Sequence, residues 1–372
     1  MDNNNIFAEL GLTADQTAIL YNIQYLETDS DAQQESNSER KSLKFKWLDK
    51  WRASISDAYP RIADGAELAW LAMDELVARV QKQFEESPSK LWFHLAVLEA
   101  ALFVPYYPLE MVEKGKKTVP SKEFSSIKDA QKNKRLEEFI LQCGQNPAFV
   151  KRVCKTYGKI TNRLNKLGER ILISALITTG VTVATVITAG ALAPALAPTI
   201  ASLLGATFPG LSGAALTSAS LAFLGGGAIA AGGAGMAGGT AVIVGGGAIL
   251  GLGAGAVTGT AGVQTAKTLG AFGKPFAISQ AAKLEVTLRE VILNEQRDVR
   301  FAQEVLLNYK QKIMDLNESL TRMELEHEGT KKDISNLKKI VDVMKRSYQQ
   351  SNRYTSSFEL GLEFQDNEED AT

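Results

Sequence analysis

A continuous stretch of 96 residues without a charged side chain dominates this sequence. No Asp, Glu, Lys or Arg lies between Arg170 and Lys267, although these residue types make up 22% of the chain. In water such a run could be satisfied only in the centre of a large protein, and the flanking chain is too short and too polar to enclose it. A lipid bilayer is its natural solvent, because a spanning helix needs about 20 consecutive apolar residues. We therefore expect a transmembrane region over residues 171–266.

The pieces of this region differ in hydrophobicity. Residues 171–193 are rich in Ile, Leu and Val and are long enough to cross a bilayer once before Pro194. Basic residues flank the whole region on both sides, so the positive-inside rule predicts an even number of spans, two or four, with both termini cytoplasmic. The weak hydrophobicity of the later pieces is compatible with a chain that is soluble before insertion. These pieces carry small side chains and lie at about 199–224, 228–244 and 246–266.

Glycine is concentrated in this region, which holds 21 of the 31 glycines in the chain. The spacing Gly233-x-Gly235-x-x-Gly238 matches a dinucleotide fingerprint, but that motif needs an acidic residue about 20 positions later. The first acidic residue after it is Glu285, so we expect neither a nucleotide nor another cofactor. Glycine costs about 1 kcal/mol relative to alanine in a helix, so its repetition needs another reason. Small residues four apart let helices pack closely in lipid, and this spacing occurs at Gly235, Gly239, Gly247, Gly251, Gly255 and Gly259.

A basic amphipathic helix is predicted at residues 127–170, immediately before the uncharged region. Apolar residues recur at spacings of three and four from Val150 to Leu167, and cations occupy the other positions. Such a helix could be a solvated member of a bundle. Its place at the entrance of a hydrophobic region favours contact with anionic lipid headgroups. The cations are Lys151, Arg152, Lys155, Lys159, Arg163, Lys166 and Arg170.

The C-terminal third has a heptad pattern, which predicts a long helix and coiled coil over residues 267–350. A continuous helix over 279–350 would be about 108 Å long, with Gly329 as a hinge or weak layer. Its partner could be a second copy of the chain, another coiled-coil protein or the helix at 127–170. A disordered acidic tail is expected at 351–372. The heptad positions include Leu306, Ile313, Leu316, Leu320, Met323, Ile334, Leu337, Val341 and Met344.

Residues 1–112 have the pattern of a helical N-terminal domain that contains all four tryptophans. Thr13 and Gln16 have the spacing of a capping box, which predicts a helix start. The polar segment 27–41 predicts a mobile linker, and residues 113–126 predict a second linker. The tryptophan-rich helices could lie on a membrane surface. One-sided spacing of the apolar residues around them favours packing in a core.

The chain offers little material for an enzyme or a metal site. It has two histidines, and His94 lies in an apolar run that is typical of a core position. Cys143 and Cys154 are too far apart on one helix for a disulfide. The tetrapeptide at Gly210 to Gly213 lacks the spacing of a nucleophile elbow. We expect no catalytic residue, no metal and no nucleic-acid partner.

The order of these segments resembles that of helical pore-forming proteins. Helices, a Gly/Ala-rich hydrophobic block and a heptad-bearing helix follow one another in the apolipoprotein L type and in helical toxins whose hydrophobic hairpin is hidden until insertion. This resemblance covers the architecture of residues 127–350. The block TAGALAPALAP followed by GGAGMAGG also resembles the membrane segment of some coiled-coil proteins with a lipase-like domain, but the missing nucleophile elbow means that this activity does not carry over.

Two functions follow from this organisation. An all-α protein that oligomerises, inserts its glycine-faced helices and perturbs a membrane would be a toxin-like effector, suited to an antiviral defence role. Alternatively, the hydrophobic region is only an anchor, and the coiled coil recruits a partner protein. A polar stripe along the spans would favour a pore, and the threonines between 178 and 188 supply one candidate. Threonine also bonds to its own helix backbone, so this feature discriminates weakly.

Overall fold

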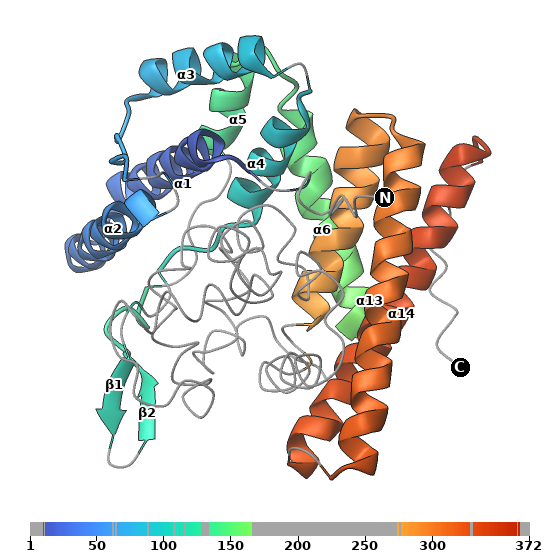
Figure 1. Cartoon of the computed structure of the whole chain (residues 1–372). Coiled ribbons are helices and arrows are strands. Elements are labelled where there is room, and N and C mark those ends of the chain that lie inside the picture. The colour runs from blue at the N-terminus through green and yellow to red at the C-terminus, as the bar shows by residue number, and fades with distance from the viewer. Residues whose placement is uncertain are drawn as a thin grey trace.

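The computed structural model describes two parts of the chain on either side of the uncharged region (Figure 1). All six glycines of the predicted helix-packing strip, together with Lys166 and Arg170, lie outside the described residues. The described residues are 10, 12–61, 63, 65–87, 89–106, 109, 111–114, 117–127, 134–165, 274, 277–327, 330–362 and 364.

These residues are mainly helical, as the sequence predicts, with one short antiparallel hairpin. The first part contains α1 (Ala14–Gln34), α2 (Ser38–Ala58), the 3-10 turn η2 (Tyr59–Arg61), α3 (Met73–Glu86), α4 (Leu91–Leu102), β1 (Met111–Lys114), β2 (Lys117–Pro120), α5 (Lys134–Gln142) and α6 (Ala148–Asn165). The second contains an α-helical stretch at 277–286, the π-helix η5 (Thr287–Glu295), α13 (Val299–Leu325) and α14 (Lys331–Glu359).

The N-terminal helices begin where the sequence indicates but extend further. Thr13 and Gln16 form the predicted capping box, and α1 starts at the next residue after Thr13. The expected mobile linker at 27–41 is wrong, because α1 continues to Gln34 and α2 begins at Ser38. The polar side chains in this segment find partners inside the fold. Asp31 is 4% exposed and forms an ion pair with Lys44, whose ammonium nitrogen lies 2.8 Å from the Asp31 carboxylate.

The expected linker at 113–126 is also ordered. β1 and β2 pair antiparallel, with Val112 opposite Val119. Beyond the hairpin, the Phe124 side chain is buried. Glu123 forms an ion pair of 2.9 Å with Lys50 of α2. Hydrogen bonding and burial therefore tie this segment to the N-terminal helices.

The heptad-bearing region folds into an antiparallel helical hairpin instead of one long helix. α13 ends at Leu325, His327 takes a positive φ of 54°, and a capping box between Thr330 and Asp333 starts α14. α14 then runs back along α13 (Figure 1). Most of the heptad side chains are buried, so they have packing partners within the chain. The pattern identified the apolar faces, but the continuous helix over 279–350 is wrong.

α14 also corrects the expected tail. It continues to Glu359, so residues 351–359 are helical instead of disordered. Phe364, beyond the helix, packs edge-on against Tyr354 with ring centroids 5.0 Å apart.

A central helix ties the two parts of the chain together. Every residue from 277 to 293 is buried, and this segment packs against α4, α6, α13 and α14. One hydrophobic cluster consequently runs from Leu10 to Met344, and a smaller cluster holds Trp47 and Trp51. The described residues therefore do not separate into independent cores at residue 112. The buried tryptophans confirm core packing.

Among the described helices, none combines the length and the apolar character that a membrane crossing requires.

Candidate functional site: an ionic cluster between the flanking helices

The two helical segments that flank the uncharged region lie against each other. α6 precedes the region and residues 277–295 follow it. Tyr157 Oη and Ser279 Oγ are hydrogen-bonded at 2.8 Å, and Thr156 Oγ1 donates to Glu290 Oε1 at 2.6 Å. Contacts more than 100 positions apart in sequence thus join the two segments.

Several charged residues reinforce this junction, and we call them the ionic cluster. They lie on α4, on α6 and on the segment 277–295. The members are Glu99, Arg152, Arg163, Lys283, Glu285, Arg289, Glu290 and Glu295.

Glu285 is at the centre of one half of the cluster. Its side chain is fully buried and accepts from Arg163 of α6 at 2.6 Å and from Arg289, one turn further on, at 2.6 Å. Ser347 of α14 donates to the same carboxylate at 3.5 Å. Two guanidinium groups and a hydroxyl therefore compensate a carboxylate that is removed from water, as burial of a charge requires.

Arg152 and Glu290 form the other half. Arg152 of α6 contacts Glu290 at 3.5 Å and also forms an ion pair with Glu295. Asn294 donates to Glu290 at 3.2 Å. The contacts of Arg152 and Arg163 are eleven positions apart on α6, so they fix this helix near both of its ends.

Glu99 and Lys283, the remaining members of the ionic cluster, form a nearly dry ion pair between α4 and the central helix. Their side chains are 3% and 4% exposed. Burial raises the pKa of Glu99, and the attraction of Lys283 opposes this effect without cancelling it. Removing one partner of a buried pair costs about 3–5 kcal/mol, because the other charge remains uncompensated.

His94 lies five residues before Glu99 on α4 and is a core residue, as predicted. Its Nδ1 lies 3.1 Å from the carbonyl oxygen of Lys90 and 3.1 Å from the Gln296 amide. Burial lowers its pKa, although Glu295, whose carboxylate is 3.5 Å from Nε2, acts in the opposite direction. The fold therefore favours the neutral imidazole.

Aromatic side chains from the C-terminal end of the chain cover Arg289. Its guanidinium lies 4.5 Å from the centroid of the Tyr354 ring and 5.0 Å from that of Phe364. Such cation–π contacts favour a guanidinium held away from water. The end of α14 is thus part of the environment of the ionic cluster.

Arg289, Glu290 and Glu295 of the ionic cluster lie on an unusual helix. Residues 287–295 form a π-helix, a conformation that is rare and frequently found at functional sites. Its last turn is closed by a hydrogen bond from the Gln296 amide to the Val291 carbonyl. Arg297 then takes a positive φ of 57°, and Asp298 caps α13.

The five predicted headgroup-binding residues that the structure describes divide into two groups. Arg152 and Arg163 form ion pairs with carboxylates of the segment 277–295, and their contact with lipid stays a prediction. Lys151, Lys155 and Lys159 are exposed on the outer face of α6. Lys151 also lies 3.6 Å from the carboxylate of Glu137 on α5. Amphipathic spacing identified the helix but could not show which of its cations pair with carboxylates of the segment 277–295.

The acidic members of the cluster were missed by the sequence analysis. Their signal is a charged residue inside an apolar run, as for Glu99 in LWFHLAVLEAAL and Glu285 in AAKLEVTL. Such residues are almost never fully buried without a partner. The pattern indicates a buried pair, but it does not name the second member.

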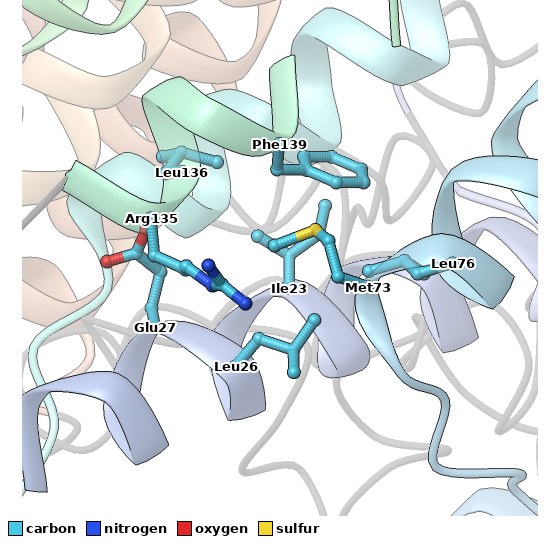
Figure 2. A pocket seen from close by; sticks show the side chains of 8 residues that line it. All are labelled: Ile23, Leu26, Glu27, Met73, Leu76, Arg135, Leu136 and Phe139. Carbon is cyan, nitrogen blue, oxygen red and sulfur yellow. The ribbon is translucent and has the colours of Figure 1, made fainter. Parts of the chain in front are cut away.

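The described residues offer little for small-molecule or metal binding. A shallow depression is lined by side chains of α1, α3 and α5, with Met73 and Phe139 among its walls and Glu27 and Arg135 at one side (Figure 2). These side chains leave no enclosed space for a ligand. In the part of the chain that the structure describes, no group of His, Cys, Asp or Glu side chains is arranged to hold a metal ion.

Comparisons with protein-family models, with curated proteins and with solved structures find no match.

Proposed function

We propose that this chain is a membrane-inserting helical protein that oligomerises and permeabilises a membrane, in the manner of a toxin-like or defence effector. One observation carries the proposal. An uncharged region of 96 residues connects two helices that ion pairs to buried carboxylates hold side by side. The charged, folded body can stay in water while the uncharged region enters lipid.

The electrostatics of the body support contact with a bilayer. Lys151, Lys155 and Lys159 are exposed on α6, the helix that precedes the uncharged region. Cations near a membrane surface gain about 1 kcal/mol each from anionic headgroups. The exposed face of α6 would hold the body against the membrane at the point where the chain enters it.

The glycine strip supplies the means of assembly within lipid. Glycines at four-residue spacing from Gly247 to Gly259 would let helices approach closely. Close packing of several such helices is the step that would turn insertion into a pore.

The test is induced expression in cells, with membrane potential and growth as readouts. We compare the natural chain with Gly251→Leu/Gly255→Leu, which fills the strip. The matched control is Gly253→Leu/Ala256→Leu, which adds the same side chains on the opposite face of the predicted helix. Rapid depolarisation by the natural chain and by this control, but not by the Gly251/Gly255 variant, is the expected result, with all three chains in the membrane fraction.

The competing function is a membrane-anchored scaffold that recruits a partner protein. Absence of depolarisation in all three chains, with each still in the membrane fraction, would contradict permeabilisation and leave the scaffold as the better explanation.

A further inference from the structure

We infer that α6 and the central helix at 277–293 remain joined when the chain acts on a membrane, so that the uncharged region enters lipid as a closed loop from an intact helical body. This inference rests on the proposed function and specifies which part of the protein moves. The alternative is a body that opens, with α6 and the central helix separating during insertion.

The junction extends along most of α6. Arg152 forms ion pairs with Glu290 and Glu295, and Arg163 forms one with Glu285. Thr156 donates a hydrogen bond to Glu290. Positions 152 and 163 are about 16 Å apart by helix rise. Contacts distributed over this length must break together if the two helices separate, because each one fixes the same relative position.

The central helix is also held by elements other than α6. Lys283 is paired with Glu99 of α4, Ser347 of α14 donates to Glu285, and Arg289 lies against Tyr354. Because every residue from 277 to 293 is buried, extracting this helix would expose the core on all sides. It would also leave carboxylates and cations without the partners that compensate their burial.

The charges argue against insertion of the junction itself. Glu285, Arg289 and Glu290 lie within nine positions of Lys283, and charged groups are costly in the bilayer centre. The uncharged region has no such cost. The boundary between what enters lipid and what remains in water therefore lies between the two joined helices and the uncharged region, which explains why both flanks would stay on one side of the membrane.

A removable cross-link tests this inference. Thr156 and Glu290, whose side-chain oxygens are 2.6 Å apart, are changed to Cys in a full-length chain that also carries Cys143→Ala and Cys154→Ala. A short bis-methanethiosulfonate linker joins the two thiols, and dithiothreitol cleaves it. Dye release is measured from vesicles of phosphatidylcholine and phosphatidylglycerol before linking, after linking and after cleavage.

The control pair is Gln303→Cys/Glu359→Cys in the same cysteine-free background. These residues are hydrogen-bonded at 3.0 Å and join α13 to the end of α14, away from α6. This pair reports any effect of the linker that is unrelated to the junction.

We expect the chain linked at 156 and 290 to release dye as fast as the unlinked chain. Loss of release on linking, with recovery after dithiothreitol and no loss in the control pair, would overturn the closed junction and leave the proposed function intact. Absence of release from every chain, the unlinked parent included, would instead overturn the proposed function and this inference with it.

Discussion

At the scale of single residues, the Glu99–Lys283 pair shows how burial and charge oppose each other. Burial raises the pKa of Glu99 even with Lys283 beside it. We predict that Lys283→Ala lowers the free energy of unfolding by about 3–5 kcal/mol, because it leaves a buried acid without a partner. Urea unfolding followed by tryptophan fluorescence measures this change.

A double variant separates the cost of an orphaned charge from the value of the pair. Glu99→Leu with Lys283→Met replaces both partners by apolar side chains, which should recover most of the loss. The pair Glu318–Arg322, whose acid is exposed and whose arginine is partly exposed, is the control, since Arg322→Ala should change stability by less than about 1 kcal/mol. Equal effects of Lys283→Ala and Arg322→Ala would refute this account of the buried pair.

His94 gives the fold a dependence on pH. Burial lowers its pKa, while Glu295 opposes this and Lys90 and Arg152 add smaller repulsions. The unfolded chain takes up a proton as the pH falls below about 6.5, whereas the folded chain resists it. The contribution of neutral His94 is therefore fully present above that pH and is lost as the pH falls toward the lowered pKa of the folded state.

The corresponding prediction compares two histidine variants. His94→Gln should reduce the loss of unfolding free energy between pH 7.5 and pH 5.5, because the titrating group is gone. His327→Gln, at an exposed site, should leave that loss unchanged. If both variants keep the slope of the natural chain, His94 is not the source of the pH dependence.

Some of these residue environments could be predicted from the sequence and others could not. The core position of His94 was predictable from the apolar run around it. The partner of Arg163 was not, because Glu285 is 122 positions away and no local spacing relates them. Pairings across the uncharged region arise from tertiary packing.

At the scale of elements, α6 has two chemically different cationic faces. Lys151→Gln/Lys155→Gln/Lys159→Gln should weaken binding to anionic vesicles, by about 3 kcal/mol for three headgroup contacts, and leave the unfolding midpoint nearly unchanged. Arg152→Gln/Arg163→Gln should instead lower stability, because it leaves carboxylates of the ionic cluster uncompensated. Vesicle sedimentation and urea unfolding measure the two effects. Equal loss of binding in both variants would show that the division of α6 into two faces is incorrect.

Packing of α13 against α14 within one chain and packing of heptads between chains differ in what a core mutation should do to stability and to oligomeric state. Leu316 is 2% exposed on α13, so Leu316→Ala should cost about 2–5 kcal/mol through the cavity it creates. The oligomeric state of the Leu316→Ala variant in detergent-free solution, measured by analytical ultracentrifugation, should match that of the natural chain. Dissociation of a natural oligomer on this change would show that the heptads pack between chains.

The hairpin also explains the limit of the heptad pattern. A repeat of apolar positions shows which face of a helix is buried, but it does not identify what covers that face. The signals for a break were present, since Gly329 precedes Thr330 and Asp333 follows at the spacing of a capping box. They place a helix start at Lys331, and the return of α14 along α13 follows from the need to bury both apolar faces.

At the scale of the whole molecule, the helical body has its own core. The large hydrophobic cluster joins α1, α4, α6, the central helix, α13 and α14, and the ionic cluster fixes α6 to the central helix. All of these contacts are made among the described residues. The sequence predicted the division between an uncharged region and a helical remainder, and it left the helix at 127–170 as one of three possible partners of the C-terminal helix. The structure shows that helices from both sides of that region share one core.

We therefore predict that the body folds without the uncharged region. Replacing residues 166–273 by a Gly/Ser linker of about twelve residues gives an average reach of roughly 17–21 Å, and Tyr157 and Ser279 are already hydrogen-bonded. Each halving of a flexible loop lowers the entropy cost of closing it by about 0.6 kcal/mol. The shortened chain should therefore unfold cooperatively, at a urea concentration no lower than the full chain in detergent.

The same shortened chain separates folding from membrane activity. It should keep the Arg163–Glu285 junction, so Arg163→Gln should destabilise it as much as it destabilises the full chain. It should also fail to release dye from vesicles while still binding anionic lipid through Lys151, Lys155 and Lys159. A shortened chain without cooperative unfolding would mean that the uncharged region contributes to the core of the body, and insertion would then require the body to open.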